Sequence, residues 1–256
     1  MATKERIDRL LVARGLADSR TRAAALVMAG KVVADGQRVD KPGAMVAIAA
    51  ELRVRGDDNP YVSRGGLKLA GALARFVPAG LAVEQRVAMD IGASTGGFTD
   101  CLLQHGAVKV HAIDVGYGQL AWKLASDPRV VVHDRCNIRT LPHDALGEPI
   151  ALAVIDCSFI ALAKVLPHVP PFLDAQADVV ALVKPQFELD PSRVGKGGIV
   201  RDDADRHAAL EAAGAAAVAC GLTIVDHCES PIEGKTGNRE WLLWLRRGLC
   251  SSIAAP

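Results

Sequence analysis

Apolar and polar positions repeat with helical spacing in the first part of the chain. Apolar residues between Ile7 and Leu11 recur at i, i+3 and i+4, which predicts a short amphipathic helix. Asp18 or Ser19 is expected to cap a second helix that ends at Gly30. After this helix, an Asp-Gly turn and a Pro-Gly turn separate short apolar runs. Strands are therefore predicted at 32–34, 38–39, 46–48 and 52–54.

From about Gly65 onward, near-continuous apolar strands alternate with alanine-rich helical stretches. This alternation is typical of an α/β fold with a doubly wound, mostly parallel sheet of the Rossmann-like type. Only a loop separates the last two strands, so we expect them to form an antiparallel pair at one edge. The predicted strands are 87–90, 108–114, 130–133, 151–156, 179–184, 222–228 and 241–245, and the predicted helices are 67–76, 98–104, 119–125 and 203–220.

The change of pattern predicts two domains, and the charges divide at nearly the same place. We expect a small α+β domain over 1–58, a linker over 59–66 and a Rossmann-like domain over 67–250. The net charge is +1, but residues 1–68 hold 13 Lys and Arg against 8 Asp and Glu, and the remainder holds 17 against 21. A basic front segment suggests a polyanionic partner. Scatter of charges over an ordinary surface is the alternative.

Several classes of protein are disfavoured by simple features. The first ten residues, MATKERIDRL, lack the apolar stretch of a secretory signal. The longest nearly uncharged run, 212–225, is too short to span a bilayer. None of the six cysteines forms a C-x-x-C pair, and no histidine lies at ligand spacing from them. We therefore expect a cytoplasmic protein with reduced cysteines and without a metal site or membrane contact.

A glycine-rich turn, MDIGASTGGFTD over residues 89–100, follows the first strand of the second domain. Glycines between a strand and a helix let backbone amides approach a ligand closely. The spacing differs from the G-x-G-x-x-G of dinucleotide-binding folds, which disfavours a nucleotide-dependent oxidoreductase. The pattern D-x-G-x-x-x-G-G instead resembles the first motif of S-adenosylmethionine methyltransferases.

Two further acids lie in register with this turn. Asp114 ends the next strand, where a carboxylate can accept both ribose hydroxyls, and Asp134 follows the third strand, near the expected adenine. Glycine-rich turns are common, so the two acids carry much of the argument. The candidate cofactor contacts are Asp90, Gly92, Ala93, Ser94, Gly96, Gly97, Phe98, Asp114, Val115, Asp134 and Asp156.

Charged residues stand at the ends of three otherwise apolar strands. Asp156 and Lys184 follow two strands, and Glu240 opens the final antiparallel strand. The carboxyl ends of parallel strands and the start of an antiparallel one lie on the same rim, so these three charges should converge. Lys68, on the helix before the sheet, is a fourth candidate, but topology does not place it. Taken singly, each of these residues has an ordinary structural explanation.

Several long stretches carry a resemblance that covers nearly the whole chain. SRGGLKL, DIGASTGGFTD, DCSFIAL, LVKPQFE, GKGGIVRD and SPIEGKTGNREWL resemble the haemolysin-A-like (TlyA) family of ribosomal RNA methyltransferases, whose catalytic domain is FtsJ-like. The resemblance implies methylation of the 2′-hydroxyl of cytidine in ribosomal RNA, with S-adenosylmethionine as cofactor and ribosomal RNA or ribosomal subunits as partners. By position, Lys68, Asp156, Lys184 and Glu240 inherit the catalytic roles.

The front segment is similar to the αL RNA-binding fold of a small-subunit ribosomal protein. The similarity rests on ERIDRLLVARGLADSRTRA, VMAGKVVADG and RVDKPGAMV. Cations on two helices and a turn suit phosphate contacts, although a solvated helical face is the simpler explanation. A glycine-rich loop over 187–201 is a further candidate, as a mobile cover and phosphate contact. The candidate RNA contacts are Arg6, Arg20, Arg22, Lys31, Lys41, Arg64 and Lys196.

The chemistry of such a reaction suits the four charged residues. A ribose hydroxyl is a very weak acid, so its attack on a methyl group needs a base or a stabilised alkoxide. Lys184 can serve as the base if burial and the like charge of Lys68 keep it neutral. Two alternatives stay open: an RNA-binding or ribosome-assembly factor without catalysis, and a membrane-lytic protein, which the absence of a basic helix with large apolar residues disfavours.

Overall fold

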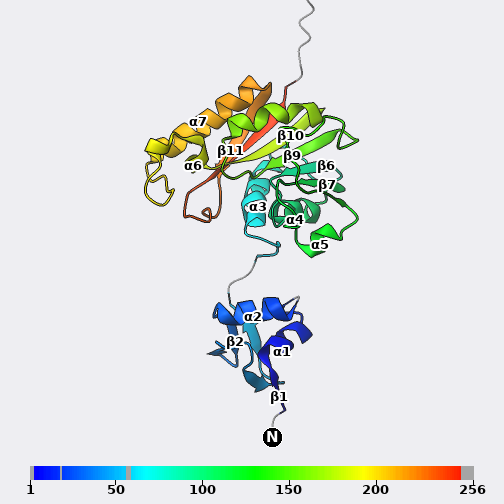
Figure 1. Cartoon of the computed structure of the whole chain (residues 1–256), viewed down its shortest axis with the longest axis vertical. Coiled ribbons are helices and arrows are strands. Elements are labelled where there is room, and N and C mark those ends of the chain that lie inside the picture. Colours follow the sequence, from blue (N-terminus) through cyan, green and yellow to red (C-terminus); the bar gives the residue numbers. More distant parts are fainter. Residues whose placement is uncertain (1–2, 18, 56–58, 249–256) are drawn as a thin grey trace, which may run out of the picture. The chain divides into compact units, whose positions relative to one another are not determined.

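The computed structural model describes residues 3–17, 19–55 and 59–248 (Figure 1). The chain divides into two compact units, and the division falls between Pro60 and Tyr61. The predicted cap Asp18, the last residues of the predicted first domain (56–58) and the end of the predicted second domain lie outside the described residues. Among the residues that the structure does describe, no helix is long and apolar enough to cross a membrane.

The front unit is a small α+β fold around one apolar cluster. Ser19 caps the second helix, because its hydroxyl accepts a hydrogen bond from the Arg22 backbone N–H at 3.2 Å. Ile7, Leu11 and Val27 are fully buried in the cluster. The elements are β1 (Lys4–Arg6), α1 (Ile7–Ala13), α2 (Arg20–Met28), β2 (Val32–Ala34), β3 (Gln37–Arg38), β4 (Met45–Ala47) and β5 (Leu52–Val54); β1 pairs with β4, and β2 lies between β3 and β5.

The second unit is built on a seven-stranded sheet in the order β11-β12-β10-β9-β6-β7-β8. Strands β6 to β10 run parallel, and β12 is antiparallel to both of its neighbours. The predicted mostly parallel sheet with an antiparallel last strand is confirmed. The bounds are β6 (Val87–Ile91), β7 (Lys109–Ile113), β8 (Val130–His133), β9 (Ile150–Ile155), β10 (Leu173–Val183), β11 (Leu222–Glu229) and β12 (Trp241–Arg247).

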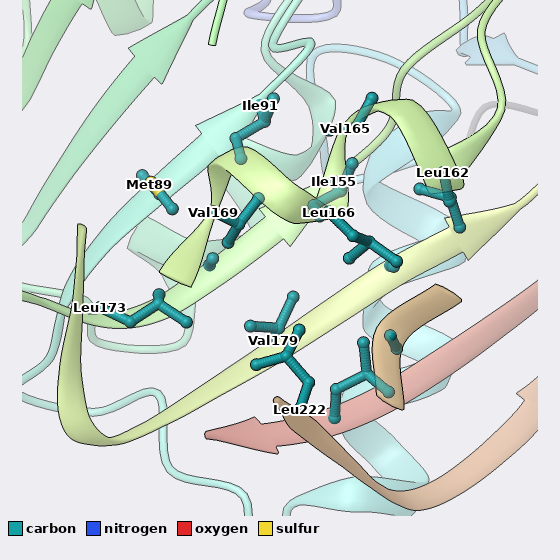
Figure 2. Packing of buried hydrophobic residues seen from close by; sticks show 14 of the residues in the cluster. Met89, Ile91, Ile155, Leu162, Val165, Leu166, Val169, Leu173, Val179 and Leu222 are labelled. Atoms are coloured by element: carbon teal, nitrogen blue, oxygen red, sulfur yellow. The ribbon is translucent and has the colours of Figure 1, made fainter. Parts of the chain in front are cut away.

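Helices cover both faces of this sheet because successive strand residues point to opposite sides. Ala88 and Val154 face the helices α3 (Gly65–Phe76) and α4 (Gly97–Gln104). Met89 and Ile155 face the opposite layer, made by α7 (Asp203–Ala219) and short 3-10 turns over 162–172. Figure 2 shows Val165, Leu166 and Val169 from these turns packed over the strands.

No helix or strand was predicted between residues 156 and 179. This segment forms three successive 3-10 turns before β10, because its prolines, at 167, 170 and 171, lack the backbone N–H that a longer helix needs. Helix α3 begins at Gly65, so the last two residues of the predicted linker are helical. Close packing requires a glycine at position 66, since an added Cβ would lie 2.3 Å from the Tyr61 ring. The remaining helices are α5 (Trp122–Ala125) and α6 (Pro185–Glu188).

Candidate active site

The rim at the carboxyl ends of the central strands gathers the predicted charges. In the register, Val183 of β10 pairs with Trp241 of β12, and Ala181 pairs with Ile155 of β9. Lys184 and Glu240 therefore leave the sheet side by side, and Asp156 leaves it on the adjacent strand. The sheet thus brings together three residues that are up to 84 positions apart in the sequence.

These charges form two ion pairs. The Lys184 ammonium lies 2.5 Å from Asp156 Oδ1 and donates to the Ser158 hydroxyl at 2.9 Å. Lys68, from α3, lies 2.5 Å from Glu240 Oε2. Lys68, Lys184 and Glu240 are buried, and the Asp156 side chain is 22% exposed. Opposite charges stabilise each other strongly here because little water screens them.

Both ion pairs face one cavity of about 630 Å³. Strand ends, the first turn of α3, α6 and the loop between β11 and β12 make its walls. The lining residues are Ser63, Arg64, Gly65, Lys68, Gly92, Ala93, Ser94, Thr95, Gly97, Phe98, Asp156, Ser158, Phe159, Lys184, Gln186, Phe187, Glu233, Lys235, Thr236 and Glu240.

The turn between β6 and α4 forms one wall, and its glycines are required by space. Gly92 has a φ of +86°, and an added Cβ would lie 2.8 Å from the Asp156 carbonyl oxygen. Gly96 has a φ of +95° at the N-cap of α4. An added Cβ on Gly97 would lie 2.2 Å from the Ser63 hydroxyl. The turn therefore offers bare backbone to a ligand in the cavity.

Asp114, at the end of β7, binds this turn directly. Its carboxylate accepts from the Ser94 backbone N–H at 2.8 Å and from the Gly116 backbone N–H at 2.7 Å. Asp134 accepts from the Gly118 backbone N–H at 2.9 Å. Val115 is 70% exposed beside them. These three predicted cofactor contacts follow the ends of β7 and β8 and do not line the cavity itself.

Asp90 lies behind the turn instead of in it. Its side chain is fully buried, and Oδ2 accepts from both the backbone N–H and the hydroxyl of Thr99 in α4. Oδ1 has no hydrogen-bond partner in the described part of the chain. Burial raises the pKa of Asp90 to about 7, and the nearby negative charge of Asp156 adds to the rise. Asp90, which we predicted as a cofactor contact, thus holds the start of α4.

The sequence did not point to several residues that line the cavity. Phe159 is 90% exposed, and its ring lies 5.3 Å from that of Phe187, centroid to centroid. One feature of the sequence could have indicated Phe159. Aromatic residues make up only 4% of the chain, and this one lies three positions after the candidate acid Asp156. Lys235 and Thr236 also escaped notice, because they lie in a loop with no strand or helix pattern.

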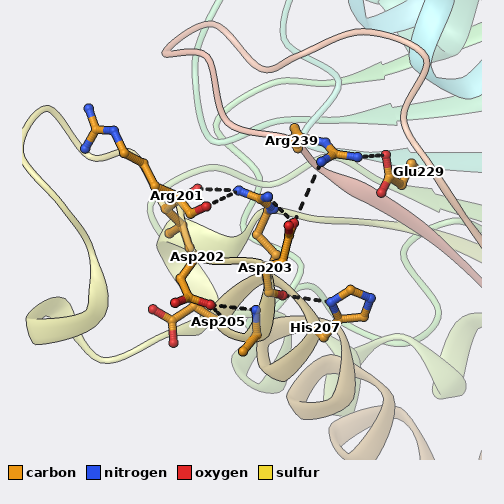
Figure 3. A network of polar contacts seen from close by, with 10 residues as sticks. Arg201, Asp202, Asp203, Asp205, His207, Glu229 and Arg239 are labelled. Carbon is orange, nitrogen blue, oxygen red and sulfur yellow. Dashed lines mark hydrogen bonds and ion pairs between the residues drawn. The ribbon is translucent and has the colours of Figure 1, made fainter.

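The loop over 187–201 is fastened to its neighbours. Buried Asn238 donates to the Gly198 carbonyl at 2.7 Å and accepts from the Val200 N–H at 2.8 Å. Arg193 forms an ion pair with Asp205 of α7. Figure 3 shows the adjoining network, in which Asp203 and Glu229 both contact Arg239. Lys196, in this loop, is exposed and does not line the cavity.

In the front unit, the predicted RNA contacts are partly engaged with an acid that the sequence reasoning overlooked. Arg6 forms a bidentate ion pair with Asp8, and Arg20 contacts the same carboxylate at 3.1 Å. The hydrogen bond from Arg6 holds the pKa of Asp8 well below its usual range. The arginine side chains remain about half exposed. Lys41 lines a separate cavity of about 600 Å³ within this unit.

The fold agrees with what known proteins show. A family model described as FtsJ-like methyltransferase matches residues 61–247, and one described as S4 domain matches residues 5–52. The 16S/23S rRNA (cytidine-2'-O)-methyltransferase TlyA of Mycobacterium tuberculosis is 48% identical over 256 residues, covering 100% of this chain and 94% of that protein. Hemolysin A of Brachyspira hyodysenteriae is 40% identical over 238 residues, or 93% of this chain and 98% of that protein.

A solved structure gives the same answer. A hemolysin candidate from Streptococcus thermophilus superposes with a TM-score of 0.73 at 45% identity, covering 96% of this chain and 90% of that chain. The resemblances stated from the sequence motifs are confirmed for both units. The chain belongs to the FtsJ-like, S-adenosylmethionine-dependent methyltransferase family, in the TlyA group that carries an S4 domain in front of the catalytic unit.

Proposed function

We propose that this protein transfers a methyl group from S-adenosylmethionine to the ribose 2′-hydroxyl of cytidine in ribosomal RNA. The observation that carries the proposal is the convergence of two buried ion pairs, Lys184–Asp156 and Lys68–Glu240, on one cavity next to a glycine turn. The printed names of the relatives supply the base, the sugar position and the class of RNA. Ribosomal RNA or a ribosomal subunit would be the partner, and the cytoplasm the place of reaction.

The residues of the turn fit the cofactor. Bare backbone at Gly92 and Gly97 suits the methionine part, with Ala93, Ser94 and Phe98 on the same wall. The Asp114 carboxylate has lone pairs left for two ribose hydroxyls after accepting from two backbone N–H groups. Val115 and Asp134 would flank the adenine. When bound, the cofactor supplies the electrophilic methyl group.

We assign the four charged residues to alignment and proton transfer. Lys184 would take the proton of the 2′-hydroxyl, with Asp156 and Ser158 fixing the direction of its side chain. Lys68 and Glu240 would hold the second wall and keep the cavity close to neutral. Because methyl transfer is a single displacement, alignment of the hydroxyl oxygen with the methyl group contributes much of the rate.

We further propose that residues 1–58 bind RNA, that 59–66 connect the units and that 67–250 catalyse the transfer. Arg6, Arg20 and Lys41 would contact phosphates from the front unit, together with Arg22 and Lys31; Arg64 and Lys196 would do so from the second unit. Two half-exposed arginines, Arg6 and Arg20, are held in place by one buried acid, Asp8. This arrangement supports a surface with fixed positive charges that could contact phosphates.

Mass spectrometry of ribosomal RNA from cells with and without this protein tests the proposal. We expect at least one cytidine to lose its 2′-O-methyl group when the protein is absent and to regain it on treatment with the purified protein and S-adenosylmethionine. An RNA-binding factor without catalysis would leave the methylation map unchanged. Binding of cofactor without transfer to any ribosomal RNA would reject the enzymatic part of the proposal.

Replacing Asp114 with alanine is expected to weaken S-adenosylmethionine binding. The carboxylate would lose its bonds to the ribose and also its hold on the Ser94 N–H, so we expect a cost of about 1.5–3 kcal/mol. Titration calorimetry measures this, with the exposed Asp144→Ala outside the cavity as the matched control. Equal affinity in both variants would remove Asp114 from the cofactor site.

Reversing the charge at Arg6, Arg20 and Lys41 is expected to flatten the salt dependence of ribosomal RNA binding. Each lost phosphate contact should lower the slope of log K against log salt by about 0.9 on duplex-like RNA. Cofactor affinity should stay unchanged, because these residues lie in the front unit. An unaltered slope in the triple variant would place the RNA-binding surface on another face.

A further inference from the structure

The loop between β11 and β12 carries Lys235, whose ammonium has no ion-pair or hydrogen-bond partner among the residues that the structure describes. We propose that Lys235 binds the phosphate on the 3′ side of the target ribose and so holds the nucleotide in line for methylation. The inference rests on the proposed transfer to RNA and goes beyond it by assigning a substrate contact to this loop.

The chemistry of the substrate demands a cation near the reacting hydroxyl. In RNA, the 3′-phosphate is attached to the carbon next to the one that carries the 2′-hydroxyl. Any strand that brings its 2′-hydroxyl to Lys184 therefore brings a phosphate anion into the same cavity. An anion that leaves water for such a site needs charged donors to compensate its lost hydration.

Most cations that line the cavity already have partners. Lys68 and Lys184 are paired with carboxylates at 2.5 Å. Arg64 donates to the Glu233 backbone carbonyl at 2.9 Å. Lys235 is exposed and lines the cavity, and its ammonium makes no ion pair or hydrogen bond with any residue that the structure describes. Its positive charge is therefore available to a ligand.

The loop holds Lys235 in a defined place. The Ser230 N–H donates to the Glu240 carbonyl at 2.9 Å and closes the base of the loop, and the Gly234 N–H donates to the Asn238 carbonyl at 2.8 Å and closes its tip. Pro231 packs so closely on α3 that an added Cβ on Gly71 would lie 2.6 Å from its ring. A phosphate contact from a braced loop loses less conformational entropy than one from a free chain.

The base of the loop is also tied to the opposite layer. Arg239 contacts Glu229 of β11 and Asp203 of α7 (Figure 3). In the same stretch, buried Asn238 reaches the Gly198 and Val200 backbone. The tip carrying Lys235 and Thr236 is therefore supported from both sides of the sheet.

Strand order favours an RNA phosphate over the other anion that the site must hold, the carboxylate of the cofactor's methionine. The glycine turn follows β6, whereas the Lys235 loop leads into β12, three strands away in the sheet. At about 4.8 Å per strand, the end of β6 and the start of β12 are about 14 Å apart in the sheet. The nearer strand to the loop is β10, whose end carries Lys184. Lys235 thus belongs to the side of the cavity that receives the nucleotide.

Single-turnover methyl transfer to ribosomal RNA from cells lacking this protein tests the inference over a series of salt concentrations. We compare the wild type with Lys235→Gln, with Lys235→Arg and with Lys164→Gln, an exposed lysine outside the cavity. Lys235→Gln should raise the RNA concentration at half-maximal rate by about 10-fold or more. It should also lower the salt slope by about 0.7 if the target is single-stranded. The calorimetric affinity for S-adenosylmethionine should not change.

Lys235→Arg should restore most of the RNA affinity, because a guanidinium also binds phosphate, and Lys164→Gln should match the wild type. An unchanged half-maximal concentration and slope in Lys235→Gln would overturn the inference while leaving the methyltransferase intact. A loss of cofactor affinity would overturn it too, since the ammonium would then bind the methionine carboxylate. A wild type without any transfer would reject the proposed function itself, and this inference with it.

Discussion

Replacing Lys184 with alanine is expected to reduce methyl transfer by about 10²–10⁴-fold, the range of a general base. Lys184 is buried at the rim and held by Asp156 and Ser158, whereas Lys68, which lines the same cavity, is paired with Glu240. RNA affinity should change little, because the front unit is untouched. Single-turnover transfer from pH 6 to 10 measures the effect, and Lys164→Ala, on the surface, is the matched control.

Lys184→Arg separates two roles for the same side chain. Lys184 can act either as the base that takes the proton of the 2′-hydroxyl or as a cation that stabilises the alkoxide. A guanidinium keeps the charge but does not lose its proton at these pH values. We expect little rescue by Lys184→Arg. A near-normal rate and pH profile in this variant would show that charge is sufficient and that the proton leaves by another route.

The four charged residues should also behave as one unit. Removing Asp156 from the Lys184→Ala variant is expected to cost much less than removing it from the wild type, because the pair has already been broken. The same holds for Lys68 and Glu240. In that pair, each single alanine variant leaves an uncompensated charge in a buried position, and the double variant removes both. Additive losses would contradict two ion pairs that act as units.

The fold was largely predictable because periodicity and topology are local in sequence. Apolar runs ending in Asp156 and Lys184 predict strands, and parallel strands necessarily bring their carboxyl ends to one rim. Glu240 was predicted on the same rim because the last two strands, with only a loop between them, were expected to be antiparallel. Lys68 was placed only by family resemblance, since nothing local indicates how a helix rotates over a sheet. The structure shows the missing link in its 2.5 Å contact with Glu240.

Contacts made by loops were the part that the sequence could not predict. Phe159 and Lys235 reach the cavity through segments without periodicity, and the position of the Lys235 loop depends on contacts made by Pro231 and Asn238. Arg6 and Arg20 were predicted as cations, but their sharing of Asp8 depends on two helices meeting at one point. Residue type predicts which chemistry is available, whereas tertiary packing decides which charges remain free.

Replacing Asp90 with asparagine is expected to remove a pH dependence from the stability of the fold. Burial raises the pKa of Asp90 to about 7, against an ordinary value of 3.8. A carboxyl group that holds its proton more tightly in the folded state stabilises the fold at low pH. This stability is fully present below pH 3.8 and is lost as the pH rises through about 7. The difference is of the order of 4 kcal/mol at 1.36 kcal/mol per pH unit.

Denaturant unfolding of the wild type and Asp90→Asn from pH 4 to pH 9 measures this effect as a difference between the two proteins. Glu188, whose pKa burial also raises to about 7, is present in both and cancels. The asparagine can still accept from Thr99 through its oxygen, so the start of α4 should be kept. We expect the stability of Asp90→Asn relative to the wild type to rise between pH 4 and pH 7 and to level off above it. A constant difference across this range would mean that Asp90 is ionised throughout, with a charged donor near Oδ1 that compensates its burial.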